Sequence, residues 1–248
     1  MAAQTAIEWT NATWNPVSGC TKLSSGCDNC YAERLAERFR GVPNHPFERG
    51  FDLTLRTHKL NEPLAWRRPR RIFVNSMSDL FHKEIPRDFL DRVFDTMEQA
   101  SWHVFQVLTK RSSLLRRYVN ARYAGYAAPP NIWLGVSVEN RSCLSRIRHL
   151  ADSAASVRFV SFEPLLENLG RVDLSGVHWA IAGGESGPSA RPVHAEWVRS
   201  LRDQCRSADV AFFFKQWGGV TAKAGGNRLD GRQWQQYPGQ PLGSCDAE

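Results

Sequence analysis

The sequence predicts an α/β fold, a partial (β/α) TIM-like barrel of about six to seven parallel strands, and three observations indicate it. Short apolar runs alternate with helix-like segments from residue 70 onward. The runs are almost continuously apolar, as expected for parallel strands covered on both faces. The chain has 248 residues, a length at which α/β barrels still form one unit. A doubly wound sheet is the second choice.

The predicted elements follow one another in a regular order. Helices are expected where apolar residues recur with helical spacing; in the segment 87–100, Phe89, Val93 and Met97 lie on one face. The other expected helices are 31–36, one from residue 112, 143–150 and 195–206. The expected strands are a short one at 13–16, then 72–75, 102–108, 132–138, 157–162, 179–182 and 210–214.

The chain shows no linker that would divide it. We expect a single domain over residues 1–238, with a cysteine-bearing loop at 14–31, an irregular cap at 217–238 and a disordered tail at 239–248. No apolar run approaches the ~20 residues of a membrane span. The N-terminus has neither the basic start nor the apolar stretch of a secretory signal. We therefore expect a cytoplasmic protein with no membrane partner.

The formal net charge is +7, and basic residues are densest at 66–71, where the sequence reads WRRPRR. A basic run beside an aromatic residue can bind a phosphate backbone. A solvated surface turn is the plainer interpretation and is preferred for this segment taken alone.

Polar residues follow each of the strands predicted after residue 70. The carboxyl ends of parallel barrel strands meet at one edge, where active sites lie. The carboxylates among these residues either hold a ribose or amino group or pair with the lysines, and the glycine pair allows either a ligand or a tight turn. The candidates are Asn75, Ser76, Asp79, Thr109, Lys110, Glu139, Glu163, Gly184, Glu185 and Lys215.

Cys20, Cys27 and Cys30 lie within eleven positions, and the last of them precedes a predicted helix. Clustered thiols in a reducing compartment favour a metal over a disulfide. Structural zinc requires four ligands, and no further Cys or His stands at finger-like spacing. Three thiolates on a [4Fe–4S] cluster leave one iron open, which suits binding and splitting a small molecule. Zinc with a distant fourth ligand and three unconnected thiols are the alternatives. The remaining cysteines, Cys143, Cys205 and Cys245, are interpreted as packing or incidental residues.

Seven stretches, in order along residues 5 to about 238, resemble the phage Gp37/Gp68 family, also called the three-Cys-motif family, which is grouped with the radical SAM superfamily. They are WNPVSGC…GCDNCYAERLAERF, RIFVNSMSDLFH, FQVLTKR, IWLGVSVEN, FVSFEPLL, IAGGESGPSARP and FFFKQWGG. The resemblance implies a radical SAM type of barrel with a [4Fe–4S] cluster on Cys20, Cys27 and Cys30. It also implies S-adenosylmethionine (SAM) on the open iron and an external one-electron reductant. A phage-encoded chain would work in the host cytoplasm.

The cysteine spacing departs from the commonest superfamily pattern. Six residues rather than three separate Cys20 from Cys27, and Tyr31 follows the last cysteine instead of preceding it. Positions of SAM contacts therefore do not transfer, and we choose candidates from the strand ends. As catalytic or carboxylate-binding residues we expect Lys110, Glu163 and Lys215. As SAM-binding residues we expect Asn75, Ser76, Asp79, Thr109, Glu139, Gly184, Glu185 and Arg191.

The resemblance and the basic segment 66–71 together suggest a substrate. We expect a DNA base or nucleotide, acted on by an isomerase, a lyase or a base-modifying enzyme. One alternative is a nucleic-acid-binding protein whose cysteines hold a structural metal. Another is a DNA repair enzyme related to photoproduct lyases.

Overall fold

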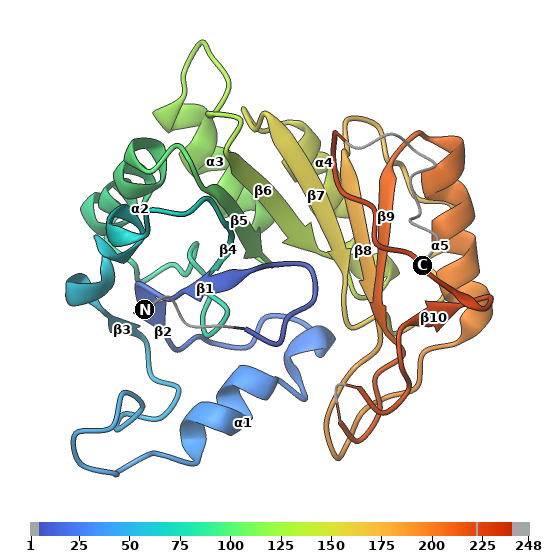
Figure 1. Ribbon diagram of the computed structural model, residues 1–248, viewed down its shortest axis with the longest axis horizontal. Helices are drawn as coiled ribbons and strands as arrows, with labels where there is room; N and C mark the ends of the chain where they lie inside the picture. Colours follow the sequence, from blue (N-terminus) through green and yellow to red (C-terminus); the bar gives the residue numbers. More distant parts are fainter. Residues whose placement is uncertain (1–4, 222, 240–248) are drawn as a thin grey trace.

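The computed structural model describes residues 5–221 and 223–239, and its centre is a seven-stranded sheet in which every pairing is parallel (Figure 1). The strand order β1-β4-β5-β6-β7-β8-β9 follows the chain, so each crossover advances in the same direction. A doubly wound sheet would reverse its order at a switch point. The predicted partial barrel is therefore confirmed. Its strands are β1 (Ala12–Trp14), β4 (Arg71–Val74), β5 (Val104–Thr109), β6 (Ile132–Ser137), β7 (Val157–Phe162), β8 (Trp179–Gly183) and β9 (Ala211–Gln216).

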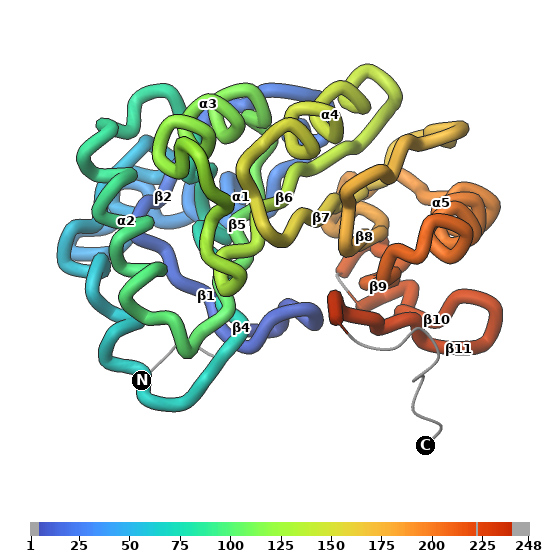
Figure 2. The backbone as a smooth tube through the Cα atoms, turned by 90° about the horizontal axis from the view of Figure 1, so that it is seen from above, coloured from blue at the N-terminus to red at the C-terminus, as the bar shows by residue number. Residues whose placement is uncertain are grey.

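Four helices cover the outer side of the curved sheet (Figure 2). They are α2 (Arg87–Gln99), α3 (Ser112–Arg122), α4 (Ser145–Ala151) and α5 (Ala195–Ser207). The predicted apolar face of α2 is buried, with Val93 and Met97 fully inaccessible, and belongs to the main core between sheet and helices. Helix α4 begins two residues later than predicted because Arg141–Cys143 form a 3₁₀ turn.

Several short elements were not predicted. The helix α1 (Tyr31–Glu37) follows the cysteine loop, as expected. The strands β2 (Val17–Ser18) and β3 (Thr54–Leu55), which were not expected, pair in a separate small sheet. Within the cap predicted to be irregular, β10 (Arg228–Leu229) and β11 (Arg232–Gln233) form a hairpin. Two-residue strands carry too little periodicity to be read from sequence. The remaining 3₁₀ turns are η1 (Ser25–Cys27), η2 (Thr57–Lys59) and η3 (Glu62–Ala65).

Aromatic side chains fill the amino-terminal part of the barrel interior. Trp9, Phe73, Phe159, Trp179 and Phe213 form one buried cluster, in which the Trp9 and Trp179 rings meet edge to face at 6.0 Å. Side chains alternate along a strand, so the inward positions nearer the carboxyl ends include Ser161 and Lys215. The interior is thus apolar at one end and polar at the other, and the polar end is the edge where barrel active sites lie.

The basic segment 66–71 lies at the opposite edge of the sheet. Arg71 begins β4 and pairs in register with Val104, the first residue of β5. The Arg71 guanidinium stacks 3.9 Å over the Tyr237 ring, and Arg70 lies 5.7 Å over the Trp66 ring. The segment therefore does not line the carboxyl edge, and its position fits the surface-turn interpretation.

No helix within residues 5–221 and 223–239 combines the length and the apolar character that a membrane crossing requires. The predicted tail, from residue 240 onward, and Cys245 lie outside the described residues.

Candidate active site

The cysteine loop crosses the carboxyl edge of the sheet. It begins at Gly19, which takes a φ of +84°, and a Cβ there would lie 2.2 Å from the Asp52 carbonyl oxygen. Only glycine permits both the angle and the close approach. The Gly19 amide donates to the carbonyl of Met77 (2.9 Å), which holds the start of the loop beside the end of β4. The loop ends at Cys30, immediately before α1.

Asp79, which follows β4, connects the first cysteine to the sheet. Its carboxylate accepts hydrogen bonds from the Thr109 hydroxyl (2.6 Å) and the Arg111 guanidinium (2.9 Å). The same guanidinium lies 3.4 Å from Cys20 Sγ and donates to the Thr21 carbonyl (3.0 Å). Burial raises the pKa of the Cys20 thiol, and Asp79 adds to the rise while Arg111 opposes it.

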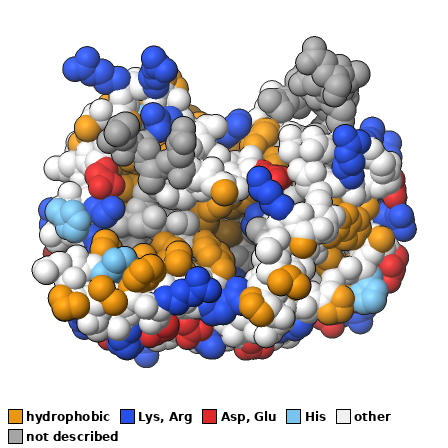
Figure 3. Space-filling view, turned by 60° about the horizontal axis from the view of Figure 1, so that its bottom comes forward, with side chains coloured by type: hydrophobic (Ala, Val, Ile, Leu, Met, Phe, Trp, Pro, Cys, Tyr) orange, Lys and Arg blue, Asp and Glu red, His pale blue; other side chains and the backbone are white. Residues whose placement is uncertain are grey.

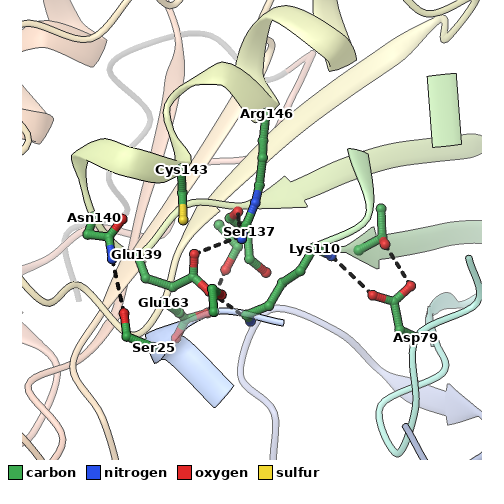
Figure 4. A network of polar contacts seen from close by, with 12 residues as sticks. Ser25, Asp79, Lys110, Ser137, Glu139, Asn140, Cys143, Arg146 and Glu163 are labelled. Atoms are coloured by element: carbon green, nitrogen blue, oxygen red, sulfur yellow. Dashed lines mark hydrogen bonds and ion pairs between the residues drawn. The ribbon is translucent and has the colours of Figure 1, made fainter. Parts of the chain in front are cut away.

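Glu139, which follows β6, is a second connection and is fully buried (Figure 4). Its Oε1 accepts from the Ser24 hydroxyl of the cysteine loop (2.6 Å), and its Oε2 accepts from Arg146 (2.7 Å). Burial alone acts to raise the pKa of Glu139, but Lys110, Ser24 and Arg146 hold it below its ordinary value. A Cβ on Gly26 would lie 2.3 Å from Glu139 Cγ. Only glycine lets the loop approach this carboxylate so closely.

Glu185, which follows β8, is a third connection. Arg191 binds it through two nitrogens, at 2.6 Å to Oε1 and 2.9 Å to Oε2, and Asn29 of the cysteine loop donates to Oε2 (2.9 Å). Arg191 also donates to the Ser25 carbonyl (2.8 Å). Burial opposes these contacts, yet the hydrogen bonds from Arg191 and Asn29 lower the pKa of Glu185. Three carboxylates on alternate strands thus hold the cysteine loop across the edge.

Three further predicted residues also make contacts within the chain. Asn75 takes a φ of +61° and is almost fully buried, and its backbone N–H donates to the Trp14 carbonyl (2.8 Å). Ser76 donates to the Asn15 side chain (3.2 Å), and its carbonyl accepts from the Tyr31 hydroxyl (2.6 Å). A Cβ on Gly184 would lie 2.0 Å from the Trp217 carbonyl oxygen, so packing between neighbouring segments requires that glycine. SAM binding by these residues stays a prediction.

Arg191 is 32% exposed although it pairs with Glu185, and three other predicted residues also keep part of their side chains accessible. Lys110, Glu163 and Lys215 are 21, 14 and 25% exposed, against 0% for Glu139 and 6% for Glu185. Lys215 pairs with Glu163 at 3.0 Å, and Lys110 lies 3.6 Å from Glu139 Oε1. These are the pairings between lysines and carboxylates that the sequence offered as one alternative. Seen from the side that brings this edge forward, the surface is hollowed near its centre between hydrophobic and basic side chains (Figure 3).

The three cysteines are free thiols, and each is partly exposed. In the part of the chain that the structure describes, no group of three or more Cys, His, Asp or Glu side chains is arranged to hold a metal ion. The sulfur atoms thus share one loop but are not drawn together in this conformation. The type and number of donors fit a [4Fe–4S] cluster with one open iron. Binding it requires the three side chains to turn toward a common point.

The candidate residues chosen from the sequence did not include five residues that connect the cysteine loop to the sheet. Arg111 directly follows Lys110 at the end of a predicted strand but was not chosen as a site residue, and Arg146 lies inside a helix where nothing distinguishes it from a surface arginine. Ser24, Gly26 and Asn29 lie between the cysteines, so their position in the loop was the available signal. Their partners are distant in sequence and follow only from the fold.

Solved structures support the fold. The chain is similar to a mutant of spore photoproduct lyase, with a TM-score of 0.50 and 11% identity over 82% of this chain and 63% of that chain. The same lyase complexed with dinucleoside spore photoproduct aligns with a TM-score of 0.45 and 10% identity, over the same shares of the two chains. The match therefore spans less than two thirds of the lyase. The architecture is a seven-stranded parallel half-barrel like the radical SAM partial barrel of that enzyme.

A search of curated proteins found no match. The model of one family, described as "Protein of unknown function (DUF5131)", matches residues 4–238. That match covers nearly the whole chain, and its description names no reaction. The chain therefore belongs to the DUF5131 family.

Proposed function

We propose that this chain is a radical SAM enzyme whose Cys20, Cys27 and Cys30 bind a [4Fe–4S] cluster. The observation that carries the proposal is the cysteine loop, which leaves β1 and is held by three buried carboxylates across the carboxyl edge of a parallel half-barrel. When bound, the cluster would supply the electron that cleaves SAM to methionine and a 5′-deoxyadenosyl radical, which removes a hydrogen atom from the substrate.

The protein's own residues would position the reactants and exclude water. Three carboxylates would fix the loop. Glu139 accepts a hydrogen bond from Ser24 of the loop, and Glu185 accepts one from Asn29 of the loop. Asp79 accepts one from Arg111, which in turn contacts the loop. The accessible Lys110, Glu163 and Lys215 remain to contact SAM or substrate. Electrostatic groups fixed in advance act strongly in such a partly dry site.

We propose a nucleotide or DNA base as the substrate. Its support is the net charge of +7 and the lysines at the carboxyl edge. The segment 66–71 gives no direct support because it lies at the other edge of the sheet. A repair lyase that acts on a damaged DNA base is one form of the same proposal.

A different function is a nucleic-acid-binding protein in which the cysteines hold structural zinc. Anaerobic reconstitution with iron and sulfide, followed by metal and sulfide analysis, separates the two. The proposal predicts a brown protein with about four irons and four sulfides per chain. Replacing Cys20, Cys27 or Cys30 by Ala should abolish iron binding, whereas Cys205→Ala should retain it. A colourless protein that binds one zinc and no iron would disprove the proposal.

A further inference from the structure

Lys110 lies among the strand-end carboxylates of the carboxyl edge without a close carboxylate partner. Four of these carboxylates each have another cation within 3.0 Å. The nearest carboxylate oxygen to Lys110 in the described residues is 3.6 Å away. The four close pairs are Asp79–Arg111 (2.9 Å), Glu139–Arg146 (2.7 Å), Glu163–Lys215 (3.0 Å) and Glu185–Arg191 (2.6 Å).

The Lys110 ammonium makes only a long contact. Its Nζ lies 3.6 Å from Glu139 Oε1, beyond the distance of about 2.7–2.9 Å that charge-assisted hydrogen bonds prefer. Glu139 Oε1 already accepts from Ser24, and Oε2 from Arg146. An ammonium carries three donors, and no acceptor in residues 5–221 and 223–239 takes a hydrogen bond from this one.

The ammonium also faces accessible space. Its side chain is 21% exposed, and Figure 4 shows it extending toward Glu139 and Glu163 in the polar layer of the site. A partly buried cation with unused donors is stabilised by an anionic oxygen group. We infer that Lys110 binds an anionic group of the ligand, a carboxylate or a phosphate.

This inference rests on the proposed function, under which two ligands could supply the anion. SAM carries an amino-acid carboxylate, and a nucleotide carries a phosphate. Two ligand pairs distinguish these sources. SAM is compared with decarboxylated SAM, which keeps the sulfonium and the amino group but lacks the carboxylate, and dTMP is compared with thymidine, which lacks the phosphate.

Calorimetric titration of the protein as isolated, without reductant, tests the inference. Wild type should prefer the member that carries the carboxylate or phosphate in at least one pair, and Lys110→Met should weaken the binding of that member about tenfold to a hundredfold. Lys110→Arg should keep the preference, which separates loss of charge from misfolding. Lys59→Met is the matched control, since Lys59 also lies 3.6 Å from a carboxylate, that of Glu62, and belongs to the 3₁₀ turns between β3 and β4 rather than to the end of a sheet strand.

The ligand pair for which Lys110→Met loses the wild-type preference identifies the anion, as carboxylate or phosphate. Wild type showing no preference in either pair would overturn the inference, as would Lys110→Met keeping it. Neither result involves SAM cleavage, so the proposed function is tested separately by iron binding and 5′-deoxyadenosine release.

Discussion

Replacing Glu139 by Gln should destabilise the protein strongly, because Glu139 joins the cysteine loop to the sheet. The change keeps the shape of the side chain and removes its charge. Arg146, whose side chain is only 10% exposed, then loses its 2.7 Å partner. Removing one member of a buried ion pair costs about 3–5 kcal/mol, since the other charge stays buried without compensation.

Thermal denaturation followed by circular dichroism measures this effect. For a domain of this size each kcal/mol lowers Tm by roughly 2–4 °C, so Glu139→Gln should melt about 6–20 °C below wild type. Glu196→Gln is the control, because its carboxylate is 65% exposed and should shift Tm very little. Adding Arg146→Met to Glu139→Gln should restore part of the loss, since no buried charge then remains unpaired. A Tm for Glu139→Gln within 2 °C of wild type, by roughly the scaling above, would refute the reasoning.

Three further outcomes are expected. Gly26→Ala should destabilise the protein by about 1–3 kcal/mol, because the added Cβ would lie 2.3 Å from Glu139 Cγ. Urea denaturation measures this loss, and an unchanged midpoint would show that the loop can move away. In iron-free protein, iodoacetamide should label Cys20, Cys27 and Cys30 before Cys205, because burial raises the pKa of Cys205 to about 12. Mass spectrometry measures the labelling, and equal labelling of all four cysteines under native conditions would contradict the described burial. The lowered pKa of Glu139 means that its contribution to stability is present above the ordinary value of about 4.3 and is lost as pH falls below it, so wild type should lose more Tm on acidification than Glu139→Gln. Parallel acid profiles of the two proteins would count against that assignment.

The fold was predictable because each strand is a nearly continuous apolar run. Residues such as Phe159, Val160 and Phe162 are buried against either the barrel interior or the helices, so both faces of β7 are apolar. The short strand β1 was also expected from its position before the cysteines. The pairing of β2 with β3 was not, because it depends on a contact between segments about 37 residues apart whose local pattern is unremarkable.

The site was predictable in composition but not in roles. Polar residues after each strand do meet at one edge, because all seven strands are parallel. Some of these residues hold other parts of the chain in place and others stay accessible. Which of them do so depends on hydrogen-bond and ion-pair partners that are distant in sequence. Glu139 and Glu163 look alike in sequence, yet one is fully buried against Ser24 and Arg146 and the other is paired with Lys215 at the accessible layer. The segment 66–71 precedes β4 and fits the surface-turn interpretation, and its sequence alone did not show at which edge of the sheet it lies.

Release of 5′-deoxyadenosine tests the central claim most directly. Anaerobically reconstituted protein is mixed with SAM and dithionite, and the products are quantified by liquid chromatography with mass detection. We predict 5′-deoxyadenosine and methionine from wild type and from Cys205→Ala, and neither product from Cys30→Ala. Wild-type protein that carries its full complement of iron and sulfide yet releases no 5′-deoxyadenosine would contradict the claim.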